Sequence, residues 1–365
     1  MIIGLVKEIK EGETRVALTP EGVKKLMQSG HTIIMEKGAG IESGYTDKQF
    51  RDHGATILQN PQKIWKMAHM IVKVKEPLPS EFKYFREGLI LFTYLHLASA
   101  PQLTRALCKS HVTAFGYETV ELEDGMLPLL TPMSEVAGRV ATQVGTRLLH
   151  AGSNPRGKGL LLGGVTGTYK GLVSVVGGGV VGRNAACVAV GLGADVVIFD
   201  INEEKLKYLN DYFGGKVKCL LSTSENLEHW ISKSDLVIGA VLVAGDKAPK
   251  IITKKMVQSM QPGSVIVDVA IDQGGCSETS KVTTLKQPTY LKYNVIHYCV
   301  PNMPALVPKT STEALTTATF PYILKLASEG VEETIRSNSP LAKGLQVYKG
   351  KVVHPVIAKV YKNLA

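Results

Sequence analysis

The sequence predicts an α/β protein built on two doubly wound, mainly parallel sheets. Short apolar segments rich in Val and Ile alternate with amphipathic segments of helical period, as βαβ units require. This alternation occurs twice, before and after a glycine-rich stretch from Gly157 to Gly171. The length of 365 residues also favours more than one domain.

The first series of elements fills about the first third of the chain. Thr19 followed by Pro20 provides an N-cap and a proline at the first helical position, and Gly30 is placed to end that helix. Thr46 precedes Gln49 with capping-box spacing. A further helix begins at Pro101. The apolar segments between these helices are predicted strands at residues 2–6, 32–36, 70–74, 89–95 and 112–117.

The second series follows one long predicted helix over residues 134–151. Its predicted strands are residues 172–176, 196–199, 217–221, 236–241, 265–269 and 294–298. After Pro301 the pattern becomes helical again, over 310–330 and the last dozen residues. We therefore expect a first domain over residues 1–130, a second over 131–304, and a segment 305–365 that returns to the first. The expected architecture is two Rossmann-like domains with a cleft between them.

Composition limits the classes of function. The chain is 44% hydrophobic and 20% charged and contains no uninterrupted apolar run of about 18 residues, so no membrane span is expected. The N-terminal residues do not resemble a signal peptide. The five cysteines are widely spaced without a C-x-x-C pair, which argues against disulfides and against a zinc site. We expect a cytoplasmic protein that holds no metal.

The formal net charge of +10 comes from scattered basic residues, without a run of five. This pattern favours a solvated basic surface, with some attraction for an anionic cofactor, over a nucleic-acid or membrane partner.

A glycine motif is the strongest local signal. Gly177, Gly179 and Gly182 fit G-x-G-x-x-G between an apolar strand and the helix-like run 183–191. In this motif the first glycine permits the tight turn, the second lets the backbone approach a pyrophosphate, and the third lets helix and strand pack closely. The free N–H groups at the helix start then face the phosphates. The motif predicts a dinucleotide site.

Asp200 ends the next predicted strand, where an acid can accept hydrogen bonds from the adenosine ribose. A 2′-phosphate would meet like charge there, so NAD is expected rather than NADP, although Lys205 nearby weakens this discrimination. The alternative is a glycine-rich turn with a capping Asp in a domain that binds no nucleotide.

Candidate catalytic groups follow apolar strands in both series. Arg15 and Lys75 are candidate cations for a substrate carboxylate, but the strand period puts Lys73 on the same face as Lys75, and both cations could be surface charges. His96 ends a strongly apolar run, where an imidazole can act as acid and base or can be structural.

Asp272 follows a buried-type strand and precedes a glycine pair, which favours a site residue, because ligands bind beyond the carboxyl ends of such strands. Asp268, inside the apolar run, is the alternative functional acid.

Together these segments resemble the alanine dehydrogenases and the transhydrogenase α subunit, in order over essentially the whole chain. The matching segments are residues 7–8 (KE), 13–20 (ETRVALTP), 74–77 (VKEP), 93–98 (TYLHLA), 133–138 (MSEVAG), 272–276 (DQGGC), 297–304 (HYCVPNMP) and 310–312 (TST).

The resemblance implies roles for individual residues. Arg15 and Lys75 would hold the substrate carboxylate and carbonyl, His96 would be the catalytic acid and base, and Asp272 the catalytic aspartate. The implied pocket wall is Tyr94, Met133 and Asn302. The implied cofactor contacts are Ser134, Gly177, Gly179, Val180, Val181, Gly182, Asp200, Lys205, Ser222, Val241, Leu242, Val269, Ala270, Ile271, Lys281, Val300, Asn302 and Met303. Among these, Lys281 stands where some relatives carry arginine.

The resemblance also implies a function, the reversible NAD-dependent oxidative deamination of L-alanine to pyruvate and ammonium by a homohexamer. The main alternative is an NAD(H)-binding α-subunit-like component of a proton-translocating transhydrogenase, in which the positions of Lys75 and His96 do not carry these residues. A catalytically silent NAD-binding protein and a saccharopine-type dehydrogenase are further alternatives.

Overall fold

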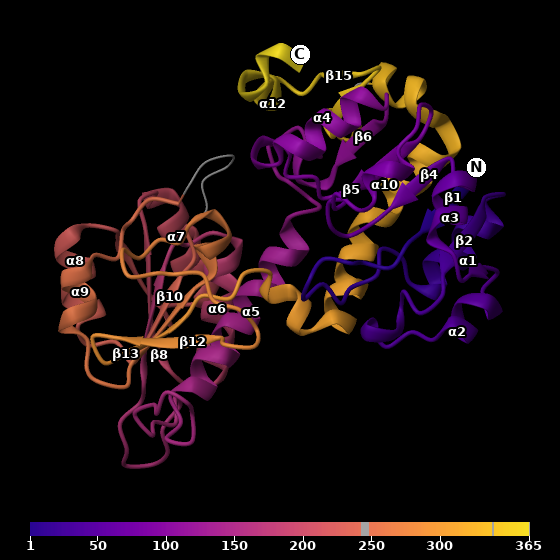
Figure 1. Ribbon diagram of the computed structural model, residues 1–365. Helices are drawn as coiled ribbons and strands as arrows, with labels where there is room; N and C mark the ends of the chain where they lie inside the picture. The colour runs from indigo at the N-terminus through magenta and orange to yellow at the C-terminus, as the bar shows by residue number, and fades with distance from the viewer. Residues whose placement is uncertain (242–247, 338, 365) are drawn as a thin grey trace. The chain divides into compact units, whose positions relative to one another are not determined.

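The computed structural model describes residues 1–241, 248–337 and 339–364. The chain divides into two compact units (Figure 1). Unit 1 comprises Met1–Met133 and Val307–Ala365, and unit 2 comprises Ser134–Leu306. In the sequence, unit 2 is therefore an insertion into unit 1. Within the described ranges, no helix has the length and apolar character that crossing a membrane requires.

The described part of unit 1 contains an eight-stranded sheet in the order β15-β14-β6-β5-β4-β1-β2-β3. The six strands from the N-terminal segment pair in parallel, whereas β14 and β15 are antiparallel additions from the C-terminal segment. Strands β4 and β5 are buried along their whole length, as expected for central parallel strands. The strand bounds are β1 (Ile2–Leu5), β2 (Thr32–Glu36), β3 (Thr56–Leu58), β4 (Met70–Val72), β5 (Ile90–Thr93), β6 (Thr113–Gly116), β14 (Leu345–Tyr348) and β15 (Lys351–Val352).

The helix starts of unit 1 follow the sequence signals. Thr19 caps α1 by accepting a hydrogen bond from the N–H of Gly22, and Thr46 and Gln49 form the capping box of α2. The longest helix, α10, is interrupted at Gly330, where φ is 78°. The helix bounds are α1 (Pro20–Gln28), α2 (Asp47–Asp52), α3 (Pro61–Met67), α4 (Pro101–Lys109), α10 (Pro308–Arg336), α11 (Pro340–Lys343) and α12 (Pro355–Val360).

Unit 2 contains a second sheet, seven-stranded in its described residues, in the order β12-β13-β11-β10-β7-β8-β9. Only β12 in this sheet is antiparallel to its neighbour; the order reverses direction at β7, the first strand of the unit. The strand bounds are β7 (Leu172–Val176), β8 (Asp195–Asp200), β9 (Lys218–Leu221), β10 (Leu236–Gly239), β11 (Val265–Asp268), β12 (Thr289–Lys292) and β13 (Val295–Tyr298).

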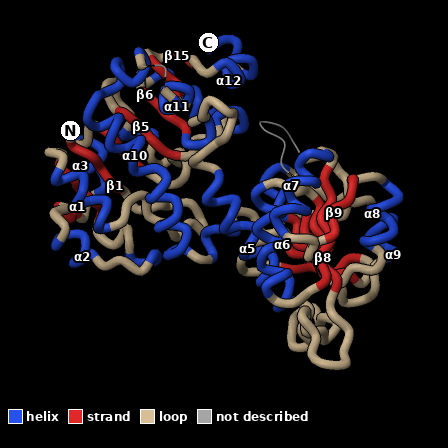
Figure 2. The backbone as a smooth tube through the Cα atoms, turned by 180° about the vertical axis from the view of Figure 1, so that it is seen from behind, coloured by secondary structure: helices blue, strands red, loops and turns tan. Residues whose placement is uncertain are grey.

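Helices flank the strands of unit 2, as Figure 2 shows. Helix α5 (Thr131–Leu148) begins in the last residues of the first segment of unit 1 and continues into unit 2. The other helices are α6 (Val180–Gly191), α7 (Glu203–Phe213), α8 (Ser224–Ile231) and α9 (Lys254–Ser259). Buried side chains of α8, α9 and β10 form part of one apolar core of this unit.

These two parallel-dominated sheets confirm the predicted α/β fold class. Some element bounds were wrong. Strand β5 ends at Thr93 rather than 95, because the chain turns at His96 into the short 3-10 helix η3 (Leu97–Ser99). Strand β4 ends at Val72 rather than 74, and α5 begins and ends three residues earlier than expected. The strands β3, β12, β14 and β15 were not predicted at all.

Candidate active site

Three candidate residues of unit 1 follow three neighbouring strands. Strands β1, β4 and β5 lie side by side in the sheet, and Arg15, Lys75 and His96 come after them in the chain. Because the carboxyl ends of parallel strands share one edge, the loops after them meet at that edge.

Arg15 is held in place by Glu13. The Arg15 side chain is buried, its Nε donates to Glu13 Oε1 over 2.7 Å, and its backbone N–H donates to the same oxygen over 3.0 Å. Nη1 of Arg15 lies 2.8 Å from Sδ of Met133, so this pocket-wall candidate contacts the guanidinium directly. Burial lowers the pKa of Arg15, but Glu13 outweighs this and raises it overall, so the guanidinium stays charged.

The structure separates the two lysines that the sequence pattern left equivalent. Lys73 is buried, and its Nζ lies 3.2 Å from Glu8 and 3.1 Å from Glu81. The positive charge of Lys73 is thus balanced by carboxylates inside the protein.

Lys75 differs, since it forms no ion pair within the described part of the chain and its Nζ lies 5.9 Å from the centre of the Tyr94 ring. Burial, together with the nearby charges of Arg15 and Lys10, lowers the pKa of Lys75. Lys75 is thus a buried cation that is available to an anionic or polar group from outside the described part of the chain.

Tyr94 forms a rigid wall beside these cations. Its side chain is buried, and its hydroxyl donates to the carbonyl of Leu129 over 2.5 Å. Its ring meets Tyr117 edge-on with the centroids 5.1 Å apart, and lies 6.0 Å from the imidazole of His96 in a stacked arrangement. Burial raises the pKa of Tyr94, so the phenol stays protonated.

His96 is exposed at the end of this row and takes the left-handed backbone conformation, with φ 50° and ψ 37°. Nδ1 of the imidazole lies 3.4 Å from Oε2 of Glu76, a charge contact longer than a well-aligned hydrogen bond. The other oxygen of Glu76 pairs with Lys10. Burial raises the pKa of Glu76, but contacts with His96 and Lys10 outweigh it and lower the pKa to about 2. Glu76 is thus an ionised carboxylate close to the ring.

In unit 2 the three motif glycines have different constraints. Gly177 has φ 107°, and a Cβ there would lie 2.6 Å from the carbonyl oxygen of Ala240. A Cβ on Gly182 would lie 1.8 Å from the carbonyl oxygen of Gly177. These two glycines are therefore required by the fold itself.

Gly179 is the N-cap of α6, and a Cβ there would meet no described residue within 4 Å. The described residues thus give no steric reason for a glycine at this position, whereas close approach of a phosphate to the backbone does. The start of a 12-residue helix with no side-chain cap also leaves N–H donors for an anion. These features fit a dinucleotide pyrophosphate.

Asp200 connects the end of β8 to the glycine turn. It is 7% exposed and accepts hydrogen bonds from the backbone N–H of Gly178 over 2.8 Å and of Asn202 over 3.0 Å. Nζ of Lys205 lies 3.2 Å from the carboxylate, so the negative charge is partly balanced.

The two candidate aspartates after β11 have different surroundings. Asp268 is fully buried and accepts hydrogen bonds from the backbone N–H groups of Ala270, Cys276 and Ser277, which fold the following loop around it. Both oxygens of Asp268 are thus bonded to the backbone of this loop, which favours a structural role for it. Asp272 is exposed in the 3-10 helix η5 (Val269–Gln273), and its Oδ2 lies 3.4 Å from the N–H of Asn302.

Most other predicted cofactor contacts follow strands of this sheet, near its carboxyl edge. Lys281 lies between η5 and β12, and Ser134 lies in α5. Leu242 lies outside the described residues. The positions after strands are Val180 and Val181 after β7, Ser222 after β9, Val241 after β10, Val269, Ala270 and Ile271 after β11, and Val300 and Met303 after β13.

Two partner residues had no role in the sequence analysis. Glu13 and Glu76 both stand in the quoted segments, and the structure pairs them with Arg15 and His96. The sequence holds one signal that could have suggested them, an acid within two residues of a candidate cation. Glu13 lies two residues before Arg15, and Glu76 directly follows Lys75.

Comparisons with known proteins match both parts of the chain to one family. Residues 4–137 match the family model described as the N-terminal domain of alanine dehydrogenase/PNT, and residues 141–355 match its C-terminal domain. The chain is 52% identical over 362 residues to an alanine dehydrogenase of Staphylococcus haemolyticus and to one of Methanococcus maripaludis, covering 99% of this chain and 96% of each relative.

Solved structures give the same result. A structure named L-alanine dehydrogenase matches with a TM-score of 0.96 at 49% identity, covering 100% of both chains. A transhydrogenase structure from Sinorhizobium meliloti matches with a TM-score of 0.83 at 24% identity, covering 97% of this chain and 99% of the other, a likeness of fold.

Proposed function

The chain belongs to the alanine dehydrogenase family, and we propose that it carries out the reversible NAD-dependent oxidative deamination of L-alanine to pyruvate and ammonium. The observation that carries this proposal is the presence, in one unit of a chain 52% identical to alanine dehydrogenases, of Arg15, an unpaired Lys75 and an oriented His96. We assign unit 1 to the substrate and unit 2 to the cofactor.

The residues of unit 1 would bind and orient the amino acid. Arg15 and Lys75 supply two fixed positive charges for the carboxylate and for the carbonyl of the product. Tyr94 and Met133 bound the space beside them. The ion pair between Arg15 and Glu13 holds the guanidinium still, so that little conformational freedom is lost when the substrate binds.

His96 would move the protons of the reaction. The imidazole takes a proton from the substrate ammonium and releases it to solvent. The neutral ring then takes a proton from the water that adds at Cα and gives it to the departing amine, while ionised Glu76 lies beside the protonated ring. Asp272 would be the second acid and base, and Asn302, whose N–H lies 3.4 Å from it, would help to fix its position.

Unit 2 would hold NAD through the glycine turn, the start of α6 and the carboxylate of Asp200. When bound, NAD supplies the acceptor for the hydride that leaves Cα. The preference for NAD over NADP is supported by buried Asp200, and Lys205 reduces it. By family resemblance the enzyme is a cytoplasmic homohexamer whose partners are its small-molecule substrates, and sedimentation measures its subunit number.

A NADH absorbance assay tests the function. The expected result is NADH formation from L-alanine and NAD, and NADH consumption with pyruvate and ammonium, without a second nucleotide. Activity that depends on a second nucleotide and ignores alanine would favour the transhydrogenase alternative. Faster turnover of a much larger amino acid would favour the saccharopine-type alternative.

A further inference from the structure

The backbone at His96 needs outside support. A residue other than glycine is unfavourable in the left-handed conformation that His96 adopts. The His96 side chain is exposed, and its contacts with Tyr94 and Glu76 involve the ring and not the backbone. The turn continues directly into η3, where the N–H of Ser99 donates to the carbonyl of His96 over 3.0 Å. The direction of the imidazole therefore depends on what holds this turn.

The carboxylate of Glu118 holds it. Glu118 lies in the 3-10 helix η4 (Tyr117–Thr119), directly after β6. Its Oε1 accepts the backbone N–H of His96 over 2.8 Å, and its Oε2 accepts that of Leu95 over 3.2 Å. Hydrogen bonds from N–H groups to a carboxylate are stronger than those to a neutral acceptor. Both oxygens of Glu118 are thus bonded to the backbone of the turn.

Gln346 in turn holds Glu118. Gln346 lies in β14, is fully buried, and donates from Nε2 to Glu118 Oε1 over 3.0 Å. Gly116 leaves room for this amide, because a Cβ at that position would lie 1.9 Å from Gln346 Nε2. A second contact comes from the same end of the chain, where the hydroxyl of Tyr361 donates to the carbonyl of Leu97 over 2.8 Å. The C-terminal segment of unit 1 therefore supports the His96 turn from two sides.

We propose that Glu118 is a positioning residue for catalysis, which fixes the backbone of His96 so that the imidazole points correctly, and that Gln346 fixes Glu118. This inference rests on the proposed catalytic role of His96. Glu118 acts through the backbone, so its removal reduces the contribution of His96 and leaves the other binding groups in place.

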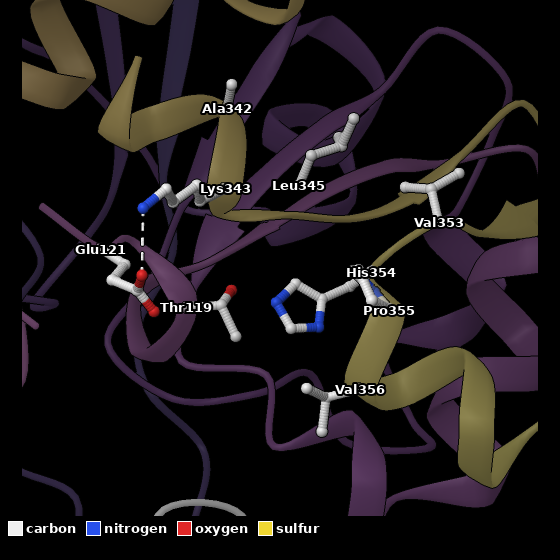
Figure 3. Close-up of a pocket in the computed structure, with 9 residues that line it drawn as sticks. All are labelled: Thr119, Glu121, Ala342, Lys343, Leu345, Val353, His354, Pro355 and Val356. Atoms are coloured by element: carbon white, nitrogen blue, oxygen red, sulfur yellow. Dashed lines mark hydrogen bonds and ion pairs between the residues drawn. The ribbon is translucent and has the colours of Figure 1, made fainter. Parts of the chain in front are cut away.

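Three variants provide the test. Glu118→Gln keeps the size of the side chain, but it replaces the charged carboxylate by a neutral amide. The single amide oxygen would have to accept from both N–H groups, and the acceptor that Oε2 offers to the N–H of Leu95 is lost. Gln346→Met keeps the length and burial of the side chain and removes the amide. Glu121→Gln is the matched control, because Glu121 stands three residues further along and pairs with Lys343 at the wall of a separate cavity of about 410 Å³ that none of the predicted site residues lines (Figure 3).

The expected result is a fall in kcat of about tenfold for Glu118→Gln, as misdirection of a catalytic group produces. Gln346→Met is expected to lower kcat by a smaller factor. The KM for alanine and the Kd for NADH should change by less than about twofold, since Arg15, Lys75 and unit 2 are untouched. Glu121→Gln should match the wild type. The folded fraction of each variant is measured by circular dichroism, so that kcat refers to folded enzyme.

The decisive measurement combines Glu118→Gln with His96→Ala. If Glu118 acts through His96, the double variant has the same residual kcat as His96→Ala alone. A further tenfold loss in that background, or an unchanged kcat for Glu118→Gln alone, would overturn the inference. If His96→Ala itself kept wild-type kcat, the proposed function would lose its acid and base, a failure that the single His96 variant identifies separately.

Discussion

At the strand ends of unit 1 the candidate site is made of charged side chains, whereas the glycine turn of unit 2 is shaped by backbone. In unit 1, Arg15 and Lys73 are matched by buried carboxylates, whereas Lys75 forms no ion pair among the described residues. In unit 2, Gly177 and Gly182 bring main chain against main chain, and Gly179 leaves the start of α6 open. This difference predicts that removing a charged side chain should damage the candidate site of unit 1. Adding a methyl group should instead damage the glycine turn of unit 2.

The largest expected effect is on stability, in unit 1. Lys73→Met removes the cation from between Glu8 and Glu81 and leaves two buried carboxylates without it. Breaking such a pair costs about 3 kcal/mol or more, measured as the free energy of unfolding in denaturant. Lys48→Met, which breaks only an exposed pair with Asp52, should cost less than about 0.5 kcal/mol. Equal losses in the two variants would contradict the buried network.

The next largest expected effect is the fall in kcat when a proton-transfer group is removed. His96→Ala and Asp272→Ala should each lower kcat by about a hundredfold or more, the usual contribution of an acid and base. The Kd for NADH, measured by fluorescence, should stay the same, because neither change alters the glycine turn. A variant that retained near-wild-type kcat would remove its residue from the mechanism.

The glycines of unit 2 should respond differently from one another. Gly179→Ala places its methyl group away from every described residue, so the melting temperature should fall only slightly, by the cost of a less favoured N-cap residue, while NADH affinity falls about tenfold. Gly182→Ala forces a Cβ against a carbonyl oxygen, and should destabilise the fold by about 1–3 kcal/mol. Gly191→Ala in the same helix meets nothing within 4 Å and is the matched control for both. Unchanged NADH binding by Gly179→Ala would argue against pyrophosphate at this turn.

The smallest effect depends on pH. Burial raises the pKa of Glu76 and its cationic neighbours lower it, to about 2 overall, below its ordinary value of 4.5. A carboxyl with a depressed folded-state pKa adds stability above its unfolded pKa and loses it as pH falls toward the folded value. Glu76→Gln should therefore cost about 1 kcal/mol at neutral pH and progressively less between about pH 5 and pH 2. Denaturant unfolding across this range measures the difference, and a constant difference at all pH values would exclude this linkage.

Much of the fold was predictable from the sequence, because its central strands are continuous apolar runs between capped helices. The strands that were missed are short, and β3 and β12 have no fully buried residue that would mark them as strands. The strands β14 and β15 pair with a segment more than 200 residues earlier in the chain, or with each other, and no local pattern encodes such pairing.

The candidate site was predictable in part. Lys73 and Lys75 were equivalent while strand alternation was assumed, but β4 ends at Val72, so alternation does not apply to them. Asp268 and Asp272 differ in burial and in the N–H groups that surround them, and both depend on the loop after β11. Glu118 had no signal, since its partners at positions 95, 96 and 346 come from separate parts of the chain.

The antiparallel addition of β14 to β6 has a consequence for synthesis on the ribosome. Unit 2 is encoded without interruption, so its described strands are all synthesised before residues Val307–Ala365 are made. Until those residues emerge, β6 remains an open edge with unpaired N–H and C=O groups, the kind of edge that recruits other strands. The nascent first unit is therefore the aggregation-prone part of the chain, and a stop codon shortly before β14 would leave it permanently so.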